Sequence, residues 1–306
     1  MLLLKWKEKA ELLKEKHKKL RLQHFGSDKK FVAVLFFGKS NPSQVYVKLK
    51  EKYSKEIWFD FLIFGQWEEN PEYPDLTNLQ KKDYNNKDEV ISLIKTLNKD
   101  DRCVGIICQL PLTDELKPYQ KDICNAISPL KDIDWLWDKL QNRAFEWKIK
   151  FLPATAQAVI SLLDAYDLWN FKWKTVSVIW QSDIVWHPIS RYLELENANV
   201  FSFDIKNTIE EISDKTRQSD LIISCTWALH LIDDKFINTE KNQTIIDVGY
   251  WFLDGKATGD VDFEKIDGKV YAISPVPWWV WPMTVACLFE NIFAIQEQKE
   301  IILNLK

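Results

Sequence analysis

The chain has 306 residues, of which 46% are hydrophobic and 28% charged, and its formal net charge is −4. This composition indicates a globular protein of one large or two ordinary domains and gives no reason to expect a nucleic-acid partner. The longest apolar run, residues 31–37, is too short to cross a bilayer, and the charged amino-terminal helix pattern argues against a signal peptide. Five cysteines without a C-x-x-C pair or a nearby histidine support neither disulfides nor a metal site, so we expect a cytoplasmic protein.

The first half of the chain alternates between strand and helix patterns. After a charged amino-terminal helix pattern, buried strands are predicted at residues 29–38, 56–64 and 103–112. Helices are predicted between and after them, at residues 41–57, 87–100 and 117–129. This alternation indicates an α/β domain with a mostly parallel sheet.

A second alternation follows an irregular stretch at residues 132–155. After a helix at 155–168, strands are predicted at residues 175–179, 199–204, 221–225, 244–250 and 270–274, and an amphipathic helix at 283–305. We therefore predict two α/β domains with an active-site cleft between them. The first comprises residues 1–148 and is completed by 283–306, and the second, residues 149–282, is a Rossmann-like dinucleotide-binding domain.

Glycine and tryptophan occur in abnormal numbers. Average glycine usage of about 7% predicts roughly 21 glycines in a chain of this length, but there are 8, together with 15 tryptophans. In the stretch SPVPWWVWPMTVA, residues 274–286, three tryptophans lie where the chain turns from a strand into a helix. Such turns favour glycine, which alone reaches positive φ without steric cost.

A second stretch shows the same anomaly. Trp180 and Trp186 bracket the turn that follows the strand at 175–179. If both are read as glycine, the turn becomes a G-x-S-x-x-x-G loop between a strand and a helix. This is a variant of the dinucleotide fingerprint, in which glycines allow close approach to a pyrophosphate. Alone, it is a weak signal.

With this substitution, residues 274–284 become S-P-V-P-G-G-V-G-P-M-T and residues 131–135 become K-D-I-D-G. The chain then resembles the bifunctional methylenetetrahydrofolate dehydrogenase/methenyltetrahydrofolate cyclohydrolases along nearly its whole length. The matching stretches include NPSQVYVKLK, GIICQLPL, SPLKDIDW, FLPAT, WQSDIVWHP, IIDVGY, GDVDF and SPVPWWVWPMT. The family usually has glycine at nine positions that are tryptophan here: 58, 135, 173, 180, 186, 227, 278, 279 and 281.

Two interpretations of these tryptophans compete. In the first they are real, and they form an aromatic core or an inactive site. In the second, the source organism reads the codon UGA as glycine, and the printed sequence translates it as tryptophan. Bulky residues at these turns would each add backbone strain of about 1–3 kcal/mol. A net stability of about 5–15 kcal/mol cannot absorb nine such terms, which favours the second interpretation.

Four residues are candidates for catalysis. Tyr46 and Lys50 are four apart on one helix and therefore share a face, although spacing alone favours an ordinary surface pair. Gln109 and Asp134 follow elements that end at the carboxyl edge of the predicted sheet, where α/β proteins bind ligands. From its position alone, Asp134 is equally well explained as a turn or capping residue.

The resemblance assigns these residues roles in two reactions. A hydride leaves 5,10-methylenetetrahydrofolate for NADP or NAD, and water then opens the methenyl product to 10-formyltetrahydrofolate. Lys50 would manage proton transfer, Gln109 would orient Lys50, Asp134 would hold the pterin, and Tyr46 would stack on the folate. The remaining substrate contacts implied are Pro275, Pro277, Trp278 and Trp279. Alanines at 154, 156 and 158 depart from the family pattern and put fine substrate geometry in doubt.

The resemblance also implies where the cofactor binds. The implied residues are Trp180, Gln181, Ser182, Asp204, Ile205 and Tyr250. The family default is NADP, and NADP-preferring members commonly have arginine at the position of Gln181. Asp204, 24 residues after position 180, has the spacing of the acidic residue that binds the ribose hydroxyls of NAD. The sequence therefore predicts unusual tolerance of NAD.

Other functions remain open from the residues. A nicotinamide-dependent dehydrogenase of small hydroxy acids would explain the second domain but not the four catalytic candidates together. A monofunctional dehydrogenase would leave Lys50 unexplained. If the tryptophans are real, a non-catalytic folate-binding protein is the alternative. The resemblance further implies a homodimer that binds a tetrahydrofolate substrate, with no metal, nucleic-acid or membrane partner.

Overall fold

The computed structural model describes residues 1–5, 7–38, 41–66, 68, 70–136, 152–168, 170–180, 186–226, 228–249, 251–253, 256–276 and 281–304. The chain divides into two compact units. The three-stranded unit comprises Glu11–Ala154 and Val285–Lys306, and the six-stranded unit comprises Met1–Ala10 and Thr155–Thr284. Both contain parallel sheets with helices, as the alternation of patterns predicted.

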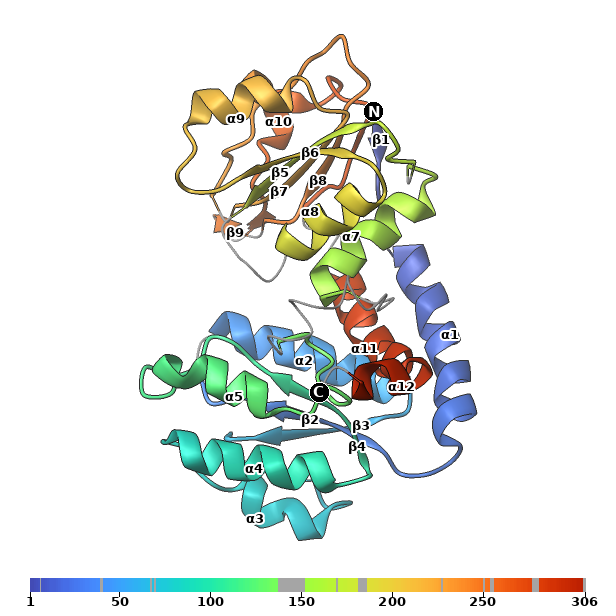
Figure 1. Cartoon of the computed structure of the whole chain (residues 1–306), viewed down its shortest axis with the longest axis vertical. Coiled ribbons are helices and arrows are strands. Elements are labelled where there is room, and N and C mark those ends of the chain that lie inside the picture. The colour runs from blue at the N-terminus through green and yellow to red at the C-terminus, as the bar shows by residue number, and fades with distance from the viewer. Residues whose placement is uncertain are drawn as a thin grey trace. The chain divides into compact units, whose positions relative to one another are not determined.

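The three-stranded unit is built on a parallel sheet in the order β3-β2-β4. Its strands are β2 (Phe31–Leu35), β3 (Asp60–Phe64) and β4 (Cys103–Cys108). Nearly every residue of these strands is buried, because helices cover both faces of the sheet. Helix α2 (Asn41–Glu56) lies on one face, and α3 (Thr77–Gln80) and α4 (Lys87–Lys99) lie on the other (Figure 1).

The other helices of this unit are mostly short, and the first residues of α1 and α11 belong to the six-stranded unit. They are α1 (Lys7–Phe25), η1 (Pro74–Leu76), η2 (Lys117–Tyr119), α5 (Gln120–Ala126), α11 (Trp281–Glu297) and α12 (Lys299–Leu303). The predicted carboxyl-terminal helix is therefore two helices, with Gln298 between them. The strand predicted to begin at residue 56 begins only at Asp60, because α2 continues to Glu56 and a capping turn follows.

The six-stranded unit contains a sheet in the order β1-β11-β8-β7-β5-β6, with all neighbouring strands parallel. The strands are β1 (Leu2–Leu3), β5 (Thr175–Trp180), β6 (Asn199–Phe203), β7 (Leu221–Cys225), β8 (Thr244–Asp247) and β11 (Ala272–Ile273). Counted from β5 in chain order, five of them run 2-1-3-4-5, a doubly wound order with its reversal between β5 and β7. This is the crevice where such sheets bind ligands.

Helices pack on both faces of this sheet. Helices α9 (Ile209–Thr216) and α10 (Phe263–Ile266) lie on one side, and α7 (Ala154–Ala165) and α8 (Trp186–Leu195) on the other (Figure 1). A short turn, η3 (Asp234–Phe236), and an antiparallel pair, β9 (Trp251–Leu253) and β10 (Lys256–Thr258), complete the unit.

One feature of this unit differs from the sequence analysis. Leu2 and Leu3, assigned to the first domain, pair with Ala272 and Ile273 of β11 in the six-stranded sheet. A two-residue strand has too little periodicity to be recognised from sequence, and pairing with β11 stabilises it.

Helix α2 ends in a hydrogen-bonded cap at Trp58. The Trp58 amide donates to the Lys55 carbonyl oxygen (3.2 Å), and the Phe59 amide donates to that of Ser54 (3.0 Å). This pair of bonds is the Schellman motif, which requires a left-handed residue at its centre. Trp58 has a φ of 65° and is therefore left-handed, although this conformation is unfavourable for a bulky residue.

Other left-handed positions show what usually satisfies this requirement. The chain after α7 turns at Asp167 and the chain after α8 at Asn197, with the same two-bond pattern and positive φ. Aspartate and asparagine tolerate this conformation. Trp135 and Trp173 also have positive φ, of 63° and 65°, and Trp173 lies within a turn closed by a bond from Lys174 to Phe171. Within the described part of the chain, the three tryptophans with positive φ all stand where the sequence predicts glycine.

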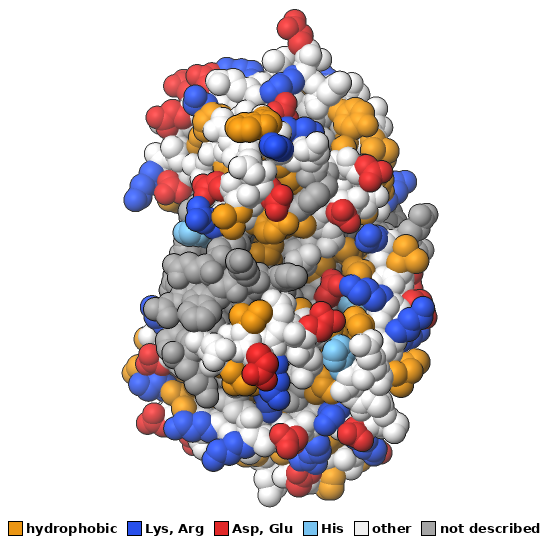
Figure 2. Space-filling model, turned by 45° about the vertical axis from the view of Figure 1, so that its right-hand side comes forward, with side chains coloured by type: hydrophobic (Ala, Val, Ile, Leu, Met, Phe, Trp, Pro, Cys, Tyr) orange, Lys and Arg blue, Asp and Glu red, His pale blue; other side chains and the backbone are white. Residues whose placement is uncertain are grey.

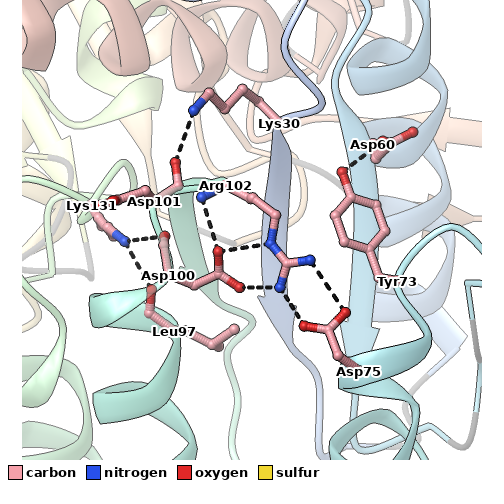
Figure 3. Close-up of polar contacts among 9 residues, drawn as sticks. All are labelled: Lys30, Asp60, Tyr73, Asp75, Leu97, Asp100, Asp101, Arg102 and Lys131. Carbon is pink, nitrogen blue, oxygen red and sulfur yellow. Dashed lines mark hydrogen bonds and ion pairs between the residues drawn. The ribbon is translucent and has the colours of Figure 1, made fainter.

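Charged side chains are distributed over both units. On the face shown in Figure 2, basic and acidic side chains of the described residues are interspersed. A dense polar network occupies the amino-terminal edge of the three-stranded sheet, where Arg102 bonds Asp75 and Asp100 and Tyr73 bonds Asp60 (Figure 3). The opposite, carboxyl-terminal edge carries the candidate site.

Candidate active site

Gln109 is the first residue beyond β4, at the carboxyl edge of the three-stranded sheet. Its amide donates to the carbonyl oxygen of Leu35, the last residue of the neighbouring β2 (3.0 Å). Its side-chain amide donates to the Leu110 carbonyl oxygen (2.9 Å). These two bonds fix the side chain, and its Oε1 is directed to Lys50.

Helix α2 supplies Tyr46 and Lys50 to the same place. The Lys50 ammonium donates to Gln109 Oε1 (3.1 Å) and lies 5.0 Å from the centre of the Tyr46 ring. Lys50 is only 4% exposed, whereas Tyr46 is partly exposed. A cation over an aromatic face is attracted by the ring quadrupole, so both contacts hold the buried amine in one position.

Asp134 reaches the site from a segment that runs beside β4. The Ile106 amide donates to the Lys131 carbonyl oxygen (2.7 Å), and Asp132 forms a parallel bridge with Ile106. Two residues further on, Asp134 lies at the carboxyl edge and remains partly exposed. The site is thus deepest at Lys50 and accessible at Tyr46 and Asp134.

Asn291 is a supporting residue that the sequence analysis missed. It lies on α11, is 1% exposed, and its side-chain amide donates to the carbonyl oxygens of Ile133 (2.9 Å) and Leu152 (3.3 Å). It therefore anchors the residue that precedes Asp134. The available signal was a single asparagine among the apolar residues of the last long helix.

Burial and mutual charge shift the titration of Lys50 and Asp134. Burial lowers the pKa of Lys50, and the Asp134 carboxylate opposes this by favouring the ammonium form. Burial raises the pKa of Asp134, and Lys50 opposes that shift. Both shifts favour neutral forms, so the pair is suited to exchange protons with a ligand. Among the described residues, no group of three or more potential metal ligands occurs.

Two family profiles match the chain, one to each half. The tetrahydrofolate dehydrogenase/cyclohydrolase catalytic domain matches residues 4–134, and the NAD(P)-binding domain of the same family matches residues 153–300. The chain belongs to the tetrahydrofolate dehydrogenase/cyclohydrolase family. It is 34% identical over 284 residues to the bifunctional protein FolD of Campylobacter jejuni subsp. doylei, covering 92% of each chain. It is 33% identical over 273 residues to FolD of Thermodesulfovibrio yellowstonii, covering 89% and 88%.

Solved structures of this family have the same fold. The bifunctional enzyme FolD of Campylobacter jejuni, 31% identical, superposes with a TM-score of 0.84 over 97% of this chain and 99% of that chain. The methylenetetrahydrofolate dehydrogenase of the silkworm Bombyx mori, 28% identical, superposes with a TM-score of 0.81 over 98% and 99%. The predicted family, fold class and type of cofactor are confirmed.

The residues predicted for this family's cofactor lie in the six-stranded unit. Trp180 ends β5, and Asp204 and Ile205 follow β6, so all three are at the carboxyl edge of the sheet. Asp204 Oδ1 accepts a hydrogen bond from the Lys206 amide (2.8 Å), and Ile205 is 82% exposed. A carboxylate at this edge, one strand away from the strand-order reversal, can accept hydrogen bonds from the hydroxyl groups of a dinucleotide ribose.

The remaining predictions divide between described and undescribed residues. Pro275 is buried directly after β11 and Ser274. The other predicted contacts, Gln181, Ser182, Tyr250, Pro277, Trp278 and Trp279, lie outside the described residues. The structure therefore groups Tyr46, Lys50, Gln109 and Asp134 in one unit and places Trp180, Asp204, Ile205 and Pro275 in the other.

Proposed function

We propose that this chain oxidises 5,10-methylenetetrahydrofolate with NAD(P)+ and hydrolyses the methenyl product to 10-formyltetrahydrofolate, with Lys50 at the centre of the second reaction. The observation that carries the proposal is the contact of a buried lysine of lowered pKa with Gln109 and Tyr46 at one sheet edge, where the Asp134 carboxylate is near enough to favour its ammonium form. Family membership supplies the pair of reactions.

The hydrolysis needs a group that moves protons without leaving the site. Water adds to the methenyl carbon, and neutral Lys50 accepts a proton from the attacking water. The carbon–nitrogen bond to the ring then breaks, Lys50 returns a proton to that nitrogen, and the second proton of the water is released. Gln109 holds the amine in position throughout, because its Oε1 accepts from the amine in either protonation state.

Asp134 and Tyr46 are proposed to bind rather than to react. Asp134 is partly exposed beside Lys50, so its carboxyl group is available to a pterin amine and ring nitrogen. The Tyr46 ring offers an apolar face to the folate. When bound, NAD(P)+ supplies the hydride acceptor for the first reaction. The chain's contribution there is the carboxyl edge of β5 and β6, with Asp204 facing the ribose.

We infer that NAD is used unusually well. Asp204 occupies the position of the acidic residue that accepts ribose hydroxyl bonds, and it would repel a 2′-phosphate. Comparison of kcat/KM for NAD+ and NADP+ tests this, and a strong NADP+ preference contradicts it. The substitution Asp204→Ser should shift the ratio towards NADP+. An unchanged ratio would show that Asp204 does not face the ribose.

We further propose that the native protein has glycine at the nine tryptophan positions where the family has glycine. Three of these, Trp58, Trp135 and Trp173, are left-handed in the structure, and Trp58 is the central residue of a helix cap. A bulky side chain costs about 1–2 kcal/mol in this conformation. Glycine has no such cost, and a UGA codon read as glycine explains all nine positions together.

Peptide mass analysis of protein isolated from the source cells tests this decoding. Glycine at positions 58, 135 and 173 is expected, and tryptophan there would contradict the proposal. Protein made with glycine codons at the nine positions, here termed the glycine-decoded protein, is then the correct material for enzymology. The version with all 15 tryptophans should fold poorly or bind no dinucleotide.

We propose a cytoplasmic homodimer. The five cysteines are free and buried, which suits a reducing compartment. The sheet of the six-stranded unit ends at β6. Two isoleucines that follow this strand are exposed, Ile205 at 82% and Ile209 at 51%. Sedimentation should give twice the chain mass, and a monomer at micromolar concentration would contradict the dimer. Among the described residues no helix is long and apolar enough to span a membrane.

Assay of the glycine-decoded protein tests the central proposal. NAD(P)H formation from methylenetetrahydrofolate reports the first reaction, and loss of methenyltetrahydrofolate absorbance without cofactor reports the second. Both are expected from one purified chain. Folate binding without either activity would identify a binding protein, and the first activity alone would identify a monofunctional dehydrogenase.

A further inference from the structure

The six-stranded unit buries two carboxylates that the proposed reactions do not use. Asp247 is the last residue of β8 and is 2% exposed, and Asp260 follows β10 and is 0% exposed. Two adjacent buried carboxyl groups are costly, because burial disfavours the charged form and each charge disfavours the other. Burial accordingly raises the pKa of both, and Asp260 raises that of Asp247 further. Such a costly pair of buried carboxyl groups needs a structural or functional explanation.

Asp260 binds the strand end and loop of β7. Its Oδ2 accepts from the hydroxyl of Ser224 (2.9 Å) and the amide of Thr226 (2.6 Å), and its Oδ1 accepts from the amide of Ala228 (3.3 Å). Ser224 is in β7, and Thr226 and Ala228 follow it. One carboxylate therefore fixes the direction in which the chain leaves β7.

Asp247 in turn holds the backbone of Asp260. Its Oδ1 accepts from the amides of Gly249 (3.0 Å) and Asp260 (3.1 Å), and its Oδ2 accepts from the amide of Val261 (3.0 Å). The Asp247 amide donates to the hydroxyl of Ser274, just beyond β11 (2.8 Å). The carboxylate pair, Asp247 and Asp260, thus joins the carboxyl ends of β7, β8 and β11.

Two glycines make room for this pair. A Cβ atom on Gly259 would lie 2.0 Å from Asp247 Oδ2, and one on Gly249 would lie 1.9 Å from Asp260 Oδ1. No side chain can be accommodated at these distances, so the backbone and the carboxylates are packed in direct contact.

We infer that Asp247 and Asp260 are positioning residues for the nicotinamide dinucleotide, because they fix the loop after β7 beside the crevice between β5 and β7. The inference rests on the proposed function. Ligands bind such sheets at this reversal of strand order, and backbone groups of the flanking loops approach the cofactor there. A rigid loop is pre-organised for binding, whereas a loose one must be ordered when the dinucleotide arrives.

The amide isostere distinguishes this role from simple space filling. Both oxygens of Asp260 accept from N–H donors, so an asparagine at that position must direct its own NH2 group at one of those donors. Asp260→Asn keeps the shape of the side chain but loses the hydrogen bond from one of the two loop amides, that of Thr226 or that of Ala228. Hydrogen bonds to a charged group are strong enough that dinucleotide affinity should fall about 10-fold to 100-fold.

The experiment compares Asp260→Asn with Asp262→Asn in the glycine-decoded protein. Asp262 lies two residues away and caps α10 through a bond from the Lys265 amide, a role that asparagine performs equally well. NADH and NADPH binding is measured by fluorescence titration, and cyclohydrolase activity is measured without cofactor. Weaker dinucleotide binding with cyclohydrolase activity kept within about twofold is expected for Asp260→Asn only. Unchanged dinucleotide binding would overturn the inference, as would a parallel loss of dinucleotide binding and cyclohydrolase activity.

Two further measurements cover the remaining cases. If Asp260→Asn does not fold, Ser224→Ala removes one donor and keeps the carboxylate. It should weaken dinucleotide binding about threefold to tenfold, and unchanged binding overturns the inference. Amide hydrogen exchange of Thr226 and Ala228 should accelerate in Asp260→Asn even without dinucleotide, and unaltered exchange would show that the pair does not hold the loop. If the parent binds no dinucleotide while exchange still responds, the proposed function fails and the loop restraint stands.

Discussion

The two edges of the sheet β3-β2-β4 both hold cationic side chains, and they surround them in opposite ways. At the carboxyl edge, Lys50 is 4% exposed and donates to the neutral amide of Gln109. At the amino edge, the side chain of Arg102 is 38% exposed and donates to the carboxylates of Asp75 and Asp100 (Figure 3). Lys50 is therefore a buried cation with few charged groups around it, whereas Arg102 is a partly exposed cation among several charged groups.

This difference determines which edge can perform proton chemistry. Burial lowers the pKa of Lys50, with Asp134 opposing the shift, whereas the hydrogen bonds that Arg102 donates to the carboxylates of Asp100 and Asp75 raise the pKa of Arg102. A group that exchanges protons near neutral pH needs a pKa shifted towards that range. Arg102 remains protonated under all working conditions, so we propose that its edge contributes to stability and the other edge to reaction.

Removal of the Lys50 amine is the most severe test of this contrast. Lys50→Ala should lower cyclohydrolase kcat about 10²-fold to 10⁴-fold, the usual contribution of a positioned acid–base group. Dinucleotide affinity, which belongs to the other unit, should remain. The measurement is methenyltetrahydrofolate hydrolysis together with NADPH titration. Parental hydrolysis by the variant would refute the assigned role.

Lys131→Ala provides the matched control. Burial also lowers the pKa of Lys131, but its ammonium donates to the backbone carbonyl oxygens of Leu97 and Asp100 at the amino edge (2.8 Å each). Its loss should reduce stability and leave hydrolysis within about threefold. If both lysine variants lose hydrolysis equally, buried lysines matter here for folding and not for chemistry.

Substitution of Asp134 should have the next largest effect. Asp134→Asn retains one acceptor oxygen and replaces the other by a donor, so it can no longer accept from two pterin groups. We expect KM for both folate substrates to rise about 10-fold to 100-fold, with a smaller change in kcat. Asp101→Asn, at an exposed position on the amino edge, is the control. An unchanged KM in Asp134→Asn would exclude the carboxylate from pterin binding.

The pH dependence of hydrolysis sharpens the contrast further. In the proposed mechanism neutral Lys50 accepts the proton, so activity should rise with pH through the pKa of Lys50, which burial places below its ordinary value of 10.5. Asp134 favours the ammonium form, so Asp134→Asn should move this ascending limb to lower pH. A limb that moves to higher pH, or does not move, would show that the two groups are not electrostatically coupled.

The same shift affects folding with a defined sign. Between the folded pKa of Lys50 and 10.5, the unfolded chain holds a proton that the folded chain lacks, so the free energy of unfolding rises with pH in that window. Asp134 acts oppositely, because its raised pKa lets the folded state keep a proton above 3.8. Urea unfolding at about pH 7 and about pH 10.5 should therefore show a weaker rise for Lys50→Met than for the parent. An equal rise would contradict a lowered lysine pKa.

The sequence predicts those features of the fold and of the candidate site that depend on local patterns. Alternating strands and helices predict the parallel sheets, and the four-residue spacing of Tyr46 and Lys50 predicts their common face. Asn291 could not be found in this way, because its contact with Ile133 joins residues 158 positions apart. The bonds that join Asp247 to Asp260 also depend on how a loop returns to the sheet. The sequence places Gln109 at the sheet edge, but only tertiary packing brings Lys50 within 3.1 Å of it.

The smallest effect is expected at the amino edge. Arg102 forms paired bonds with Asp75 and with Asp100, and its guanidinium lies 5.4 Å from the centre of the Tyr73 ring. Arg102→Lys keeps the charge but loses the fork geometry and most of these bonds. Since the side chain is 38% exposed, solvent screening limits the loss to about 1 kcal/mol of unfolding free energy.

Both enzymatic activities of Arg102→Lys should equal those of the parent at temperatures where it is folded. The network lies at the starts of β3 and β4, while the proposed reacting groups lie at the opposite edge of the sheet. Urea unfolding and the two activity assays on the same preparation give the comparison. A fall in hydrolysis without a fall in stability would mean that the sheet transmits changes from one edge to the other. The division into a stabilising edge and a reacting edge would then be wrong.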